Sequence, residues 1–145
     1  MTEKDMEDVL QIRRALDELA VQLACDKITE AQLRMIRLAM KEFEESSRSR
    51  DVKKVAQADV AFHDAIYKAA DNPKLMNLLN NLREQIYRYR VEYLKDESAY
   101  PALIAEHQNI YDGLLRKDKE YVVQAMSKHV VNQEIVMKNI IREQE

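Results

Sequence analysis

Glycine and proline are nearly missing from this chain, whose 145 residues include one Gly and two Pro. Tight turns between β-strands depend on these residues and on Asn-Gly pairs, so their scarcity excludes a fold built from hairpins. Long helices with short polar connections are the alternative for a chain that is 46% hydrophobic and can bury a core. The sequence therefore predicts an all-α fold and a single domain over residues 1–145.

Excess basic charge, cysteine pairs and long apolar runs are also lacking. The formal net charge is -3, whereas a domain that binds nucleic acid by itself usually has a basic face. The single cysteine, Cys25, excludes an internal disulfide, and its apolar neighbours suit a small buried side chain. No run reaches the ~18 apolar residues of a membrane span, and the N-terminus lacks the order of a signal peptide. We expect a cytoplasmic protein with no membrane partner.

Apolar residues recur every three or four positions, which is the spacing of helices with one buried face. The pattern predicts about six helices, which cover Met6–Lys27, a segment after Thr29, residues 52–70, and segments after Asn72, Tyr100 and Asp118. In the first helix the predicted buried stripe is Val9, Ile12, Leu16, Leu19, Ala20 and Leu23. In the fourth helix it is Leu75, Leu78, Leu79, Leu82, Ile86, Tyr89 and Tyr93. Thr29 with Gln32 predicts a capping box, and Asn72 with Pro73 predicts a helix start.

All three histidines fall on apolar stripes, and a carboxylate accompanies them. Asp59 and His63 share one helical face, and positions four apart are close enough, about 6 Å between Cβ atoms, for both side chains to reach one ion. With His107 and His129 they form a set of four buried ligand-type residues, which need partners because an unpaired buried charge is costly. A divalent cation satisfies all four, and so does an Asp-His hydrogen-bond network. The spacing alone does not decide between them.

Other motifs for metal or catalytic chemistry are missing. A ferritin-like site needs Glu-x-x-His twice and a zincin needs His-Glu-x-x-His, and neither occurs. The lone Gly113 belongs to no phosphate loop, and we expect it to permit close packing of its helix. Arg side chains present paired donors that suit carboxylates, which makes Arg13, Arg83 and Arg90 candidates for an anion clamp.

Three segments resemble the FadR-type C-terminal (FCD) domain of GntR-family transcription regulators. The stretch from Asp59 to Leu75 is similar to that domain's D-x-x-F-H…A-x-x-N-P-x-L signature. The stretch from Glu106 to His129 is similar to its E-H-x-x-I…D…A…M-x-x-H segment. The opening residues 12–17 resemble its R-x-x-L-E start, with Asp17 in place of Glu. The resemblance covers nearly the whole chain.

This resemblance implies an antiparallel helical bundle with a divalent metal at its centre, zinc first, with nickel, manganese or iron as alternatives. The implied metal ligands are Asp59, His63, His107 and His129. The resemblance also implies a homodimer and a small carboxylic-acid or sugar-acid effector whose carboxylate completes the metal shell. Asn132 and Gln133 stand where many members have Arg. The candidate effector contacts are Arg13, Arg83, Arg90, Asn132 and Gln133.

The function implied by the resemblance is effector sensing in a transcription regulator, not catalysis. The family's N-terminal winged helix-turn-helix has no counterpart in this sequence, so we expect DNA contact only through a domain outside it, whether the chain is an excised domain or a fragment. Two other functions stay open. A solvent-open His₃Asp metal can activate water, as in a hydrolase, and a metal-free dimerisation module would use the cluster only as a core network.

Overall fold

The computed structural model describes residues 1–144, and over that range it contains six α-helices, one 3-10 turn and no strand. The elements are α1 (Glu3–Lys27), α2 (Glu30–Ser46), α3 (Val52–Ala70), α4 (Pro73–Leu94), η1 (Glu97–Ala99), α5 (Tyr100–Arg116) and α6 (Lys119–Gln144). The predicted all-α fold and the number of helices are confirmed. None of these six helices has an apolar stretch long enough to cross a membrane.

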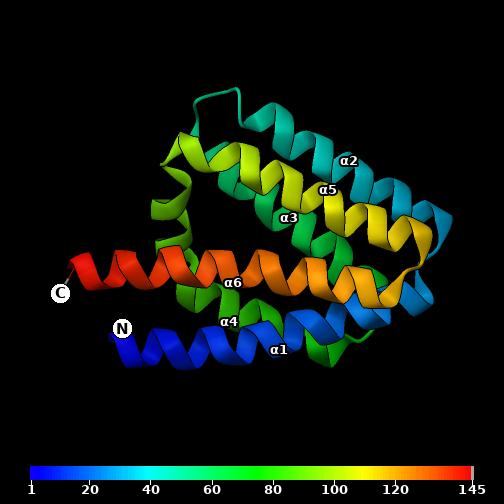
Figure 1. The fold of residues 1–145 in the computed structure, drawn as a ribbon, viewed down its shortest axis with the longest axis horizontal. Helices are drawn as coiled ribbons and strands as arrows, with labels where there is room; N and C mark the ends of the chain where they lie inside the picture. Colours follow the sequence, from blue (N-terminus) through cyan, green and yellow to red (C-terminus); the bar gives the residue numbers. More distant parts are fainter. Residues whose placement is uncertain (145) are drawn as a thin grey trace.

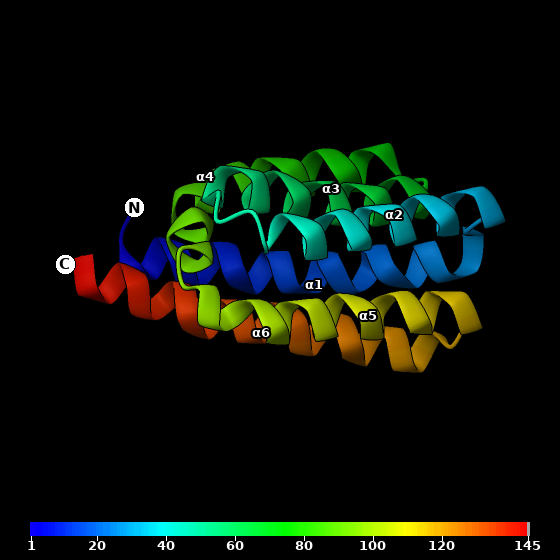
Figure 2. The same cartoon turned by 90° about the horizontal axis from the view of Figure 1, so that it is seen from above.

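The helices lie side by side, and α1 packs against α6, α3 and α4. Figure 1 shows α1 and α6 next to each other, with both chain ends at the same end of the bundle. In Figure 2, α5 and α6 lie on one side of α1, and the helices α2, α3 and α4 lie on its other side. α1 and α4 run in opposite directions, since Lys27 at the end of α1 donates a hydrogen bond to the carbonyl of Ala70, just before α4.

Side-chain caps set the helix starts. The predicted capping box of Thr29 and Gln32 is present, and Asn72 accepts a hydrogen bond from the first turn of α4, as predicted. α1 begins three residues earlier than the predicted Met6. The reason is a second capping box, formed by Thr2 and Asp5, which the apolar spacing does not reveal.

The buried face of α1 differs from the predicted stripe. Ile12 and Leu19 are 51% and 39% exposed, whereas Arg13 and Asp17 are buried. Leu78, predicted to be buried in α4, is 56% exposed. The prediction was wrong at these three apolar positions because it assumed that the core side of a helix is apolar, and this bundle buries charged pairs at its centre.

Two apolar clusters fill the bundle, and the ring of His107 lies where they meet. One cluster contains Phe62 and the other contains Phe43. The His107 ring stacks on Phe62 with 4.0 Å between ring centroids and meets Phe43 edge-on at 4.5 Å. Cys25 belongs to the first cluster and is 4% exposed, as expected for a small buried side chain. The polar centre of the bundle therefore has apolar packing on both sides.

Candidate metal centre

Three helices supply the four predicted metal ligands. Asp59 and His63 lie one turn apart on α3, His107 lies on α5 and His129 on α6. Each of the four residues is at most 1% exposed. The structure therefore brings together, in the interior, residues that are up to 70 positions apart in the sequence.

The ligand atoms of these residues point toward one another. The Nε2 atom of His129 lies 3.3 Å from Nε2 of His63. The Oδ1 atom of Asp59 lies 3.6 Å from Nε2 of His63 and 3.5 Å from Nε2 of His107. Two ligands held about 2.1 Å from a zinc ion at the tetrahedral angle are about 3.4 Å apart. The observed separations match those of ligands that share one ion.

Hydrogen bonds among the described residues do not satisfy this cluster. Both carboxylate oxygens of Asp59 and the Nε2 atom of His107 are buried without a hydrogen-bond partner. Separations of 3.5 and 3.6 Å are longer than effective hydrogen bonds, and a buried polar atom without a partner is costly. A cation among these atoms would remove that cost, so the residues fit a divalent metal better than a closed hydrogen-bond network.

Glu106 orients His129 from the side away from the cluster. Its Oε1 atom lies 2.6 Å from Nδ1 of His129, and its Oε2 atom accepts a hydrogen bond from Asn132. A proton on Nδ1 that is donated to Glu106 leaves the lone pair of Nε2 free for a metal. This role could not be predicted from the sequence, because Glu106 only precedes the candidate ligand His107, and its target His129 lies on the next helix.

Burial and the neighbouring charges set the protonation of the cluster. Burial lowers the pKa of His63 to about 3 and also lowers the pKa of His107, so both imidazoles are neutral at pH 7. Burial alone would raise the pKa of Asp59, but the Arg90 cation and the nearby imidazoles of His107 and His63 hold that pKa well below its usual range. An ionised carboxylate and neutral imidazoles are the forms that bind a metal.

A group of buried polar side chains adjoins the metal ligands. Arg13 and Arg90, each 2% exposed, both donate hydrogen bonds from Nη2 to the side-chain oxygen of Gln133, at 3.0 and 3.1 Å. Arg90 Nε also lies 3.3 Å from Oδ2 of Asp59, and Arg13 Nε lies 3.1 Å from Asp17. Three of the five predicted effector contacts therefore lie together beside the candidate metal site.

The other two predicted effector contacts have different partners. Arg83 forms an ion pair with Asp64 at 2.8 Å and donates a hydrogen bond to Asn80. Asn132 donates to Glu106. Neither side chain has a hydrogen bond to Arg13, Arg90 or Gln133 among the described residues. Arg83 thus belongs to the contact between α3 and α4, and Asn132 supports the residue that orients His129.

Asp17 and Tyr67 extend the buried group, and the sequence analysis gave neither a role. The hydroxyl of Tyr67 donates a 2.6 Å hydrogen bond to Asp17. Burial raises the pKa of Tyr67 well above its usual value, and the Asp17 carboxylate raises it further. Hydrogen bonds and ion pairs therefore run from Tyr67 through Asp17, Arg13, Gln133 and Arg90 to the candidate metal ligand Asp59.

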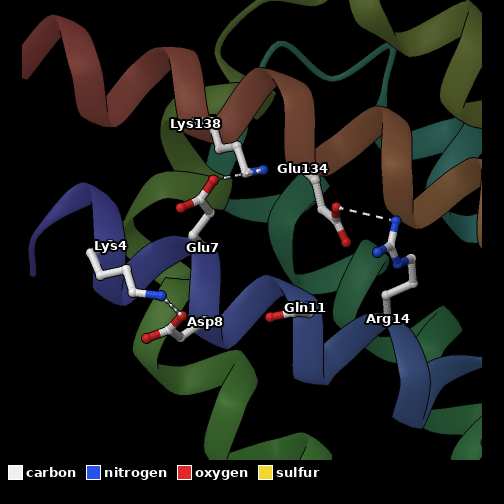
Figure 3. A pocket seen from close by; sticks show the side chains of 7 residues that line it. All are labelled: Lys4, Glu7, Asp8, Gln11, Arg14, Glu134 and Lys138. Carbon is white, nitrogen blue, oxygen red and sulfur yellow. Dashed lines mark hydrogen bonds and ion pairs between the residues drawn. The ribbon is translucent and has the colours of Figure 1, made fainter.

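A polar groove of about 190 Å³ lies between α1 and α6 (Figure 3). In it Lys4 pairs with Asp8, Glu7 with Lys138, and Arg14 approaches Glu134 at 3.9 Å. Glu134 is only 7% exposed, and its Oε1 atom has no hydrogen-bond partner among the described residues. Burial raises the pKa of this carboxyl, although the nearby cations oppose the shift.

Comparison with known proteins gives a consistent result. The sequence model of the FCD domain family matches residues 8–132. The chain is 24% identical to the uncharacterized HTH-type transcriptional regulator YdhC of Bacillus subtilis (strain 168) over 144 residues, which cover 99% of the chain and 64% of YdhC. It is 29% identical to the HTH-type transcriptional regulator LutR of the same strain over 148 residues, covering 99% of the chain and 67% of LutR.

A third relative is the galactonate operon transcriptional repressor of Escherichia coli (strain K12), which is 22% identical over 118 residues. That match covers 79% of the chain and 50% of the repressor, so the chain spans between half and two thirds of the length of these relatives. All three relatives are transcriptional regulators, not enzymes. The solved structure of E. coli McbR/YncC superposes with a TM-score of 0.85 at 20% identity, over 98% of this chain and 70% of that one, and this likeness shows a shared fold.

Proposed function

This chain belongs to the FCD domain family, and we propose that it is the effector-binding and dimerisation domain, over residues 1–145, of a GntR-type transcription regulator. Its sensing site would be a divalent metal held by Asp59, His63, His107 and His129, together with a small carboxylic acid or sugar acid. The observation that carries the proposal is the approach of Asp59 Oδ1 to Nε2 of His63 and of His107, and of His129 Nε2 to His63 Nε2, at ligand spacing. Among the described residues, Asp59 Oδ1 and His107 Nε2 have no hydrogen-bond partner.

Zinc is the metal that this donor set suits best. Three imidazoles and one carboxylate fit zinc, and they also fit nickel, manganese or iron, which accept more than four ligands. In a five- or six-coordinate ion the carboxylate of the effector completes the shell. The ion joins α3, α5 and α6, so its binding adds a cross-link between elements that are distant in the sequence.

The buried arginines suit the same acid. Arg13 and Arg90 direct two guanidinium groups at one amide oxygen of Gln133, an arrangement in which a ligand carboxylate can replace that oxygen. The metal ligands are at most 1% exposed, so an acid reaches the ion only after neighbouring side chains move. We infer that this movement is the conformational response to the effector, and that it favours one arrangement of a homodimer over another.

DNA binding in this proposal belongs to a winged helix-turn-helix domain outside the chain, and the regulator acts in the cytoplasm. A hydrolase would need an ion open to solvent, whereas the ligands here are buried and the three relatives are regulators. The fit of the donor set to an ion also favours the metal-binding function over a metal-free dimerisation module.

The metal proposal is tested by elemental analysis of protein purified without chelator, which should contain about one divalent ion per chain. Asp59→Asn and His107→Ala should lower both metal content and melting temperature. The matched control is Asp64→Asn, which changes a carboxylate on the same helix that pairs with Arg83 and should keep the metal. At free metal a hundredfold above Kd, binding contributes roughly 2.7 kcal/mol, so a chelator should lower the melting temperature of wild type. Metal-free wild type with no chelator effect would refute the proposal.

The effector proposal is tested by thermal shift with acetate, succinate and galactonate on zinc-loaded and chelated protein. An effector acid should stabilise the loaded form and have little effect on the chelated form, because its contact with the ion would be lost. Arg90→Lys should weaken the acid response more than it weakens zinc binding, since lysine cannot present paired donors. Equal stabilisation of both forms would show that the ion is only structural.

A further inference from the structure

A row of ion pairs follows the seam between α1 and α6. Near the start of α1, Arg142 of α6 donates a hydrogen bond to Glu3. Near the end of α1, Lys119 of α6 pairs with Asp26 at 2.7 Å. At both ends of the seam the two helices are therefore close enough for charged side chains to bond directly across it.

Between these two ends, the pairs that cross the polar groove stay open. Glu7 lies 3.7 Å from Lys138, and Arg14 lies 3.9 Å from Glu134 (Figure 3). Both separations are longer than an effective hydrogen bond. The groove of about 190 Å³ occupies this part of the seam. Its lining therefore presents charged groups that are not fully paired with one another.

Glu134 is the lining residue that most needs a partner. Figure 3 shows its carboxylate directed from α6 toward α1, into the groove. The residue is 7% exposed, and its Oε1 atom is buried without a hydrogen-bond partner among the described residues. The last torsion of a glutamate side chain is soft, so the carboxylate can turn either oxygen toward the groove. A cation that enters the groove would remove the cost of this unpaired buried acid.

The other charges of the groove decide which kind of cation fits. Lys138 and Arg14 act on Glu134 from both sides, so a metal ion or a simple amine would meet two cations as well as the acid. A ligand that brings its own carboxylate avoids this repulsion. Arg14 can receive that carboxylate, because its side chain is 40% exposed and a guanidinium presents paired donors.

We propose that the groove between α1 and α6 binds a small zwitterion, with an ammonium and a carboxylate close together, as in the free α-amino acids. The ammonium donates to Glu134 on α6 and the carboxylate accepts from Arg14 on α1, so the ligand completes the pair that the two helices leave open. The groove is smaller than the sites of drug-sized ligands, which suits a compact amino acid such as glycine. This site lies outside the proposed metal and acid site and needs no metal.

A glycine titration followed by NMR tests the site. In isotopically labelled wild type, the backbone amide signals around Gln11, Arg14 and Glu134 should shift together and saturate, while signals at the far end of the bundle stay in place. Zinc content is measured before and after the titration, because glycine can also bind zinc, and it should not change. The absence of a saturable shift localised at the groove would overturn the inference.

Substitutions of the two proposed contacts test their roles. Glu134→Gln and Arg14→Gln should each raise the Kd of glycine by at least about tenfold, since a charge-assisted hydrogen bond is lost. Glu134→Gln removes a buried charge without changing the shape of the side chain, so this variant stays folded and its loss of glycine is not a loss of structure. The matched control is Asp26→Asn, which breaks an ion pair between the same two helices outside the groove and should bind glycine like wild type. Undiminished binding in Glu134→Gln or Arg14→Gln would overturn the inference.

Ligands that carry half of the zwitterion test the ligand class. Methylammonium has only the cation and acetate only the anion, so each should bind at the groove at least about tenfold more weakly than glycine. Acetate that instead shifts signals around Arg13 and Gln133 would be acting at the proposed effector site, which the position of the shifts distinguishes. Methylammonium that binds the groove as well as glycine would show a plain amine site, and acetate that does so would show an anion site. Either result would overturn the zwitterion proposal.

Discussion

The side chain of Gln133 satisfies two buried cations with one oxygen. Arg13 and Arg90 donate to it, and both guanidinium groups are nearly inaccessible to water. Gln133→Ala should lower the free energy of unfolding by about 1–3 kcal/mol, because two buried donors lose their acceptor. If this oxygen occupies the position of a ligand carboxylate, added acetate should restore part of the stability of the variant, measured by thermal unfolding.

A second substitution at the same position separates this explanation from a general packing defect. Gln133→Glu supplies a carboxylate from within the chain, so the variant should fold stably and lose its response to added acids. An alanine variant that acetate does not stabilise more than it stabilises wild type would contradict the role of Gln133 as a substitute for the ligand.

Glu134, the next residue in the sequence, is an acid whose surroundings disfavour its charged form. Burial raises its folded-state pKa, so the folded protein binds the proton more tightly than the unfolded chain does. Its contribution to stability is therefore complete below the unfolded pKa and is lost as pH rises through the folded pKa. Glu134→Gln should raise the melting temperature at pH 7 and change it little near pH 4. An equal effect at both pH values would contradict this assignment, and Glu7→Gln in the same groove serves as the exposed control.

The functional roles of some residues could be predicted from the sequence, and those of others could not. The four candidate metal ligands were predicted because their chemistry is unusual on apolar stripes, and the structure places their side chains close together. Glu106 and Asp17 could not be assigned in this way, because an acid on a helix is usually a solvated residue. Their roles depend on contacts with His129 on α6 and Tyr67 on α3, and contacts between helices are not visible in local spacing.

Among the elements, α5 and α6 approach each other closely at Gly113, the single glycine of the chain. A Cβ atom on Gly113 would lie 2.7 Å from Cβ of Val122 and 3.1 Å from its Cα, so the absence of a side chain lets the two helices meet. This confirms the expected packing role of Gly113. The contact lies beside the connection between α5 and α6, about two helical turns from His107 on α5 and from His129 on α6, so it helps to set the separation of two candidate metal ligands.

Gly113→Ala should therefore destabilise the protein although alanine is the better helix former. The gain in helix propensity is about 1 kcal/mol, whereas overpacking against backbone costs about 1–3 kcal/mol, and here the obstructing atoms cannot rotate away. A lower melting temperature and weaker zinc binding, measured by chelator competition, should occur together. A more stable variant with unchanged zinc affinity would show that the helices separate freely at this point.

Helix ends were more predictable than helix faces. Caps such as Thr29 with Gln32 are local, and the structure confirms them. The face of α1 depends instead on what surrounds it, since Arg13 and Asp17 are buried only because Gln133 and Tyr67 offer partners from other helices. Ile12 and Leu19 are then turned outward.

At the scale of the whole molecule, the proposed effector contacts connect three helices. Arg13 belongs to α1 and Arg90 to α4, and Gln133 on α6 connects their guanidinium groups inside the bundle. An acid whose carboxylate replaces the Gln133 oxygen would change how these helices are held together.

An effector acid should therefore change the separation of the two N-termini in the zinc-loaded dimer. Helix shifts of about 1–2 Å are typical at interfaces that switch, and the end of the bundle amplifies a small rotation at its middle. Distances between spin labels at the two Lys4→Cys sites should shift when the acid that stabilises the protein is added. The shift should be absent in Asp59→Asn, which lacks the ion, and present in Arg83→Ala, because Arg83 contacts α3 and not the buried group. An acid that raises the melting temperature without moving the labels would mean that binding does not change the arrangement of the proposed dimer.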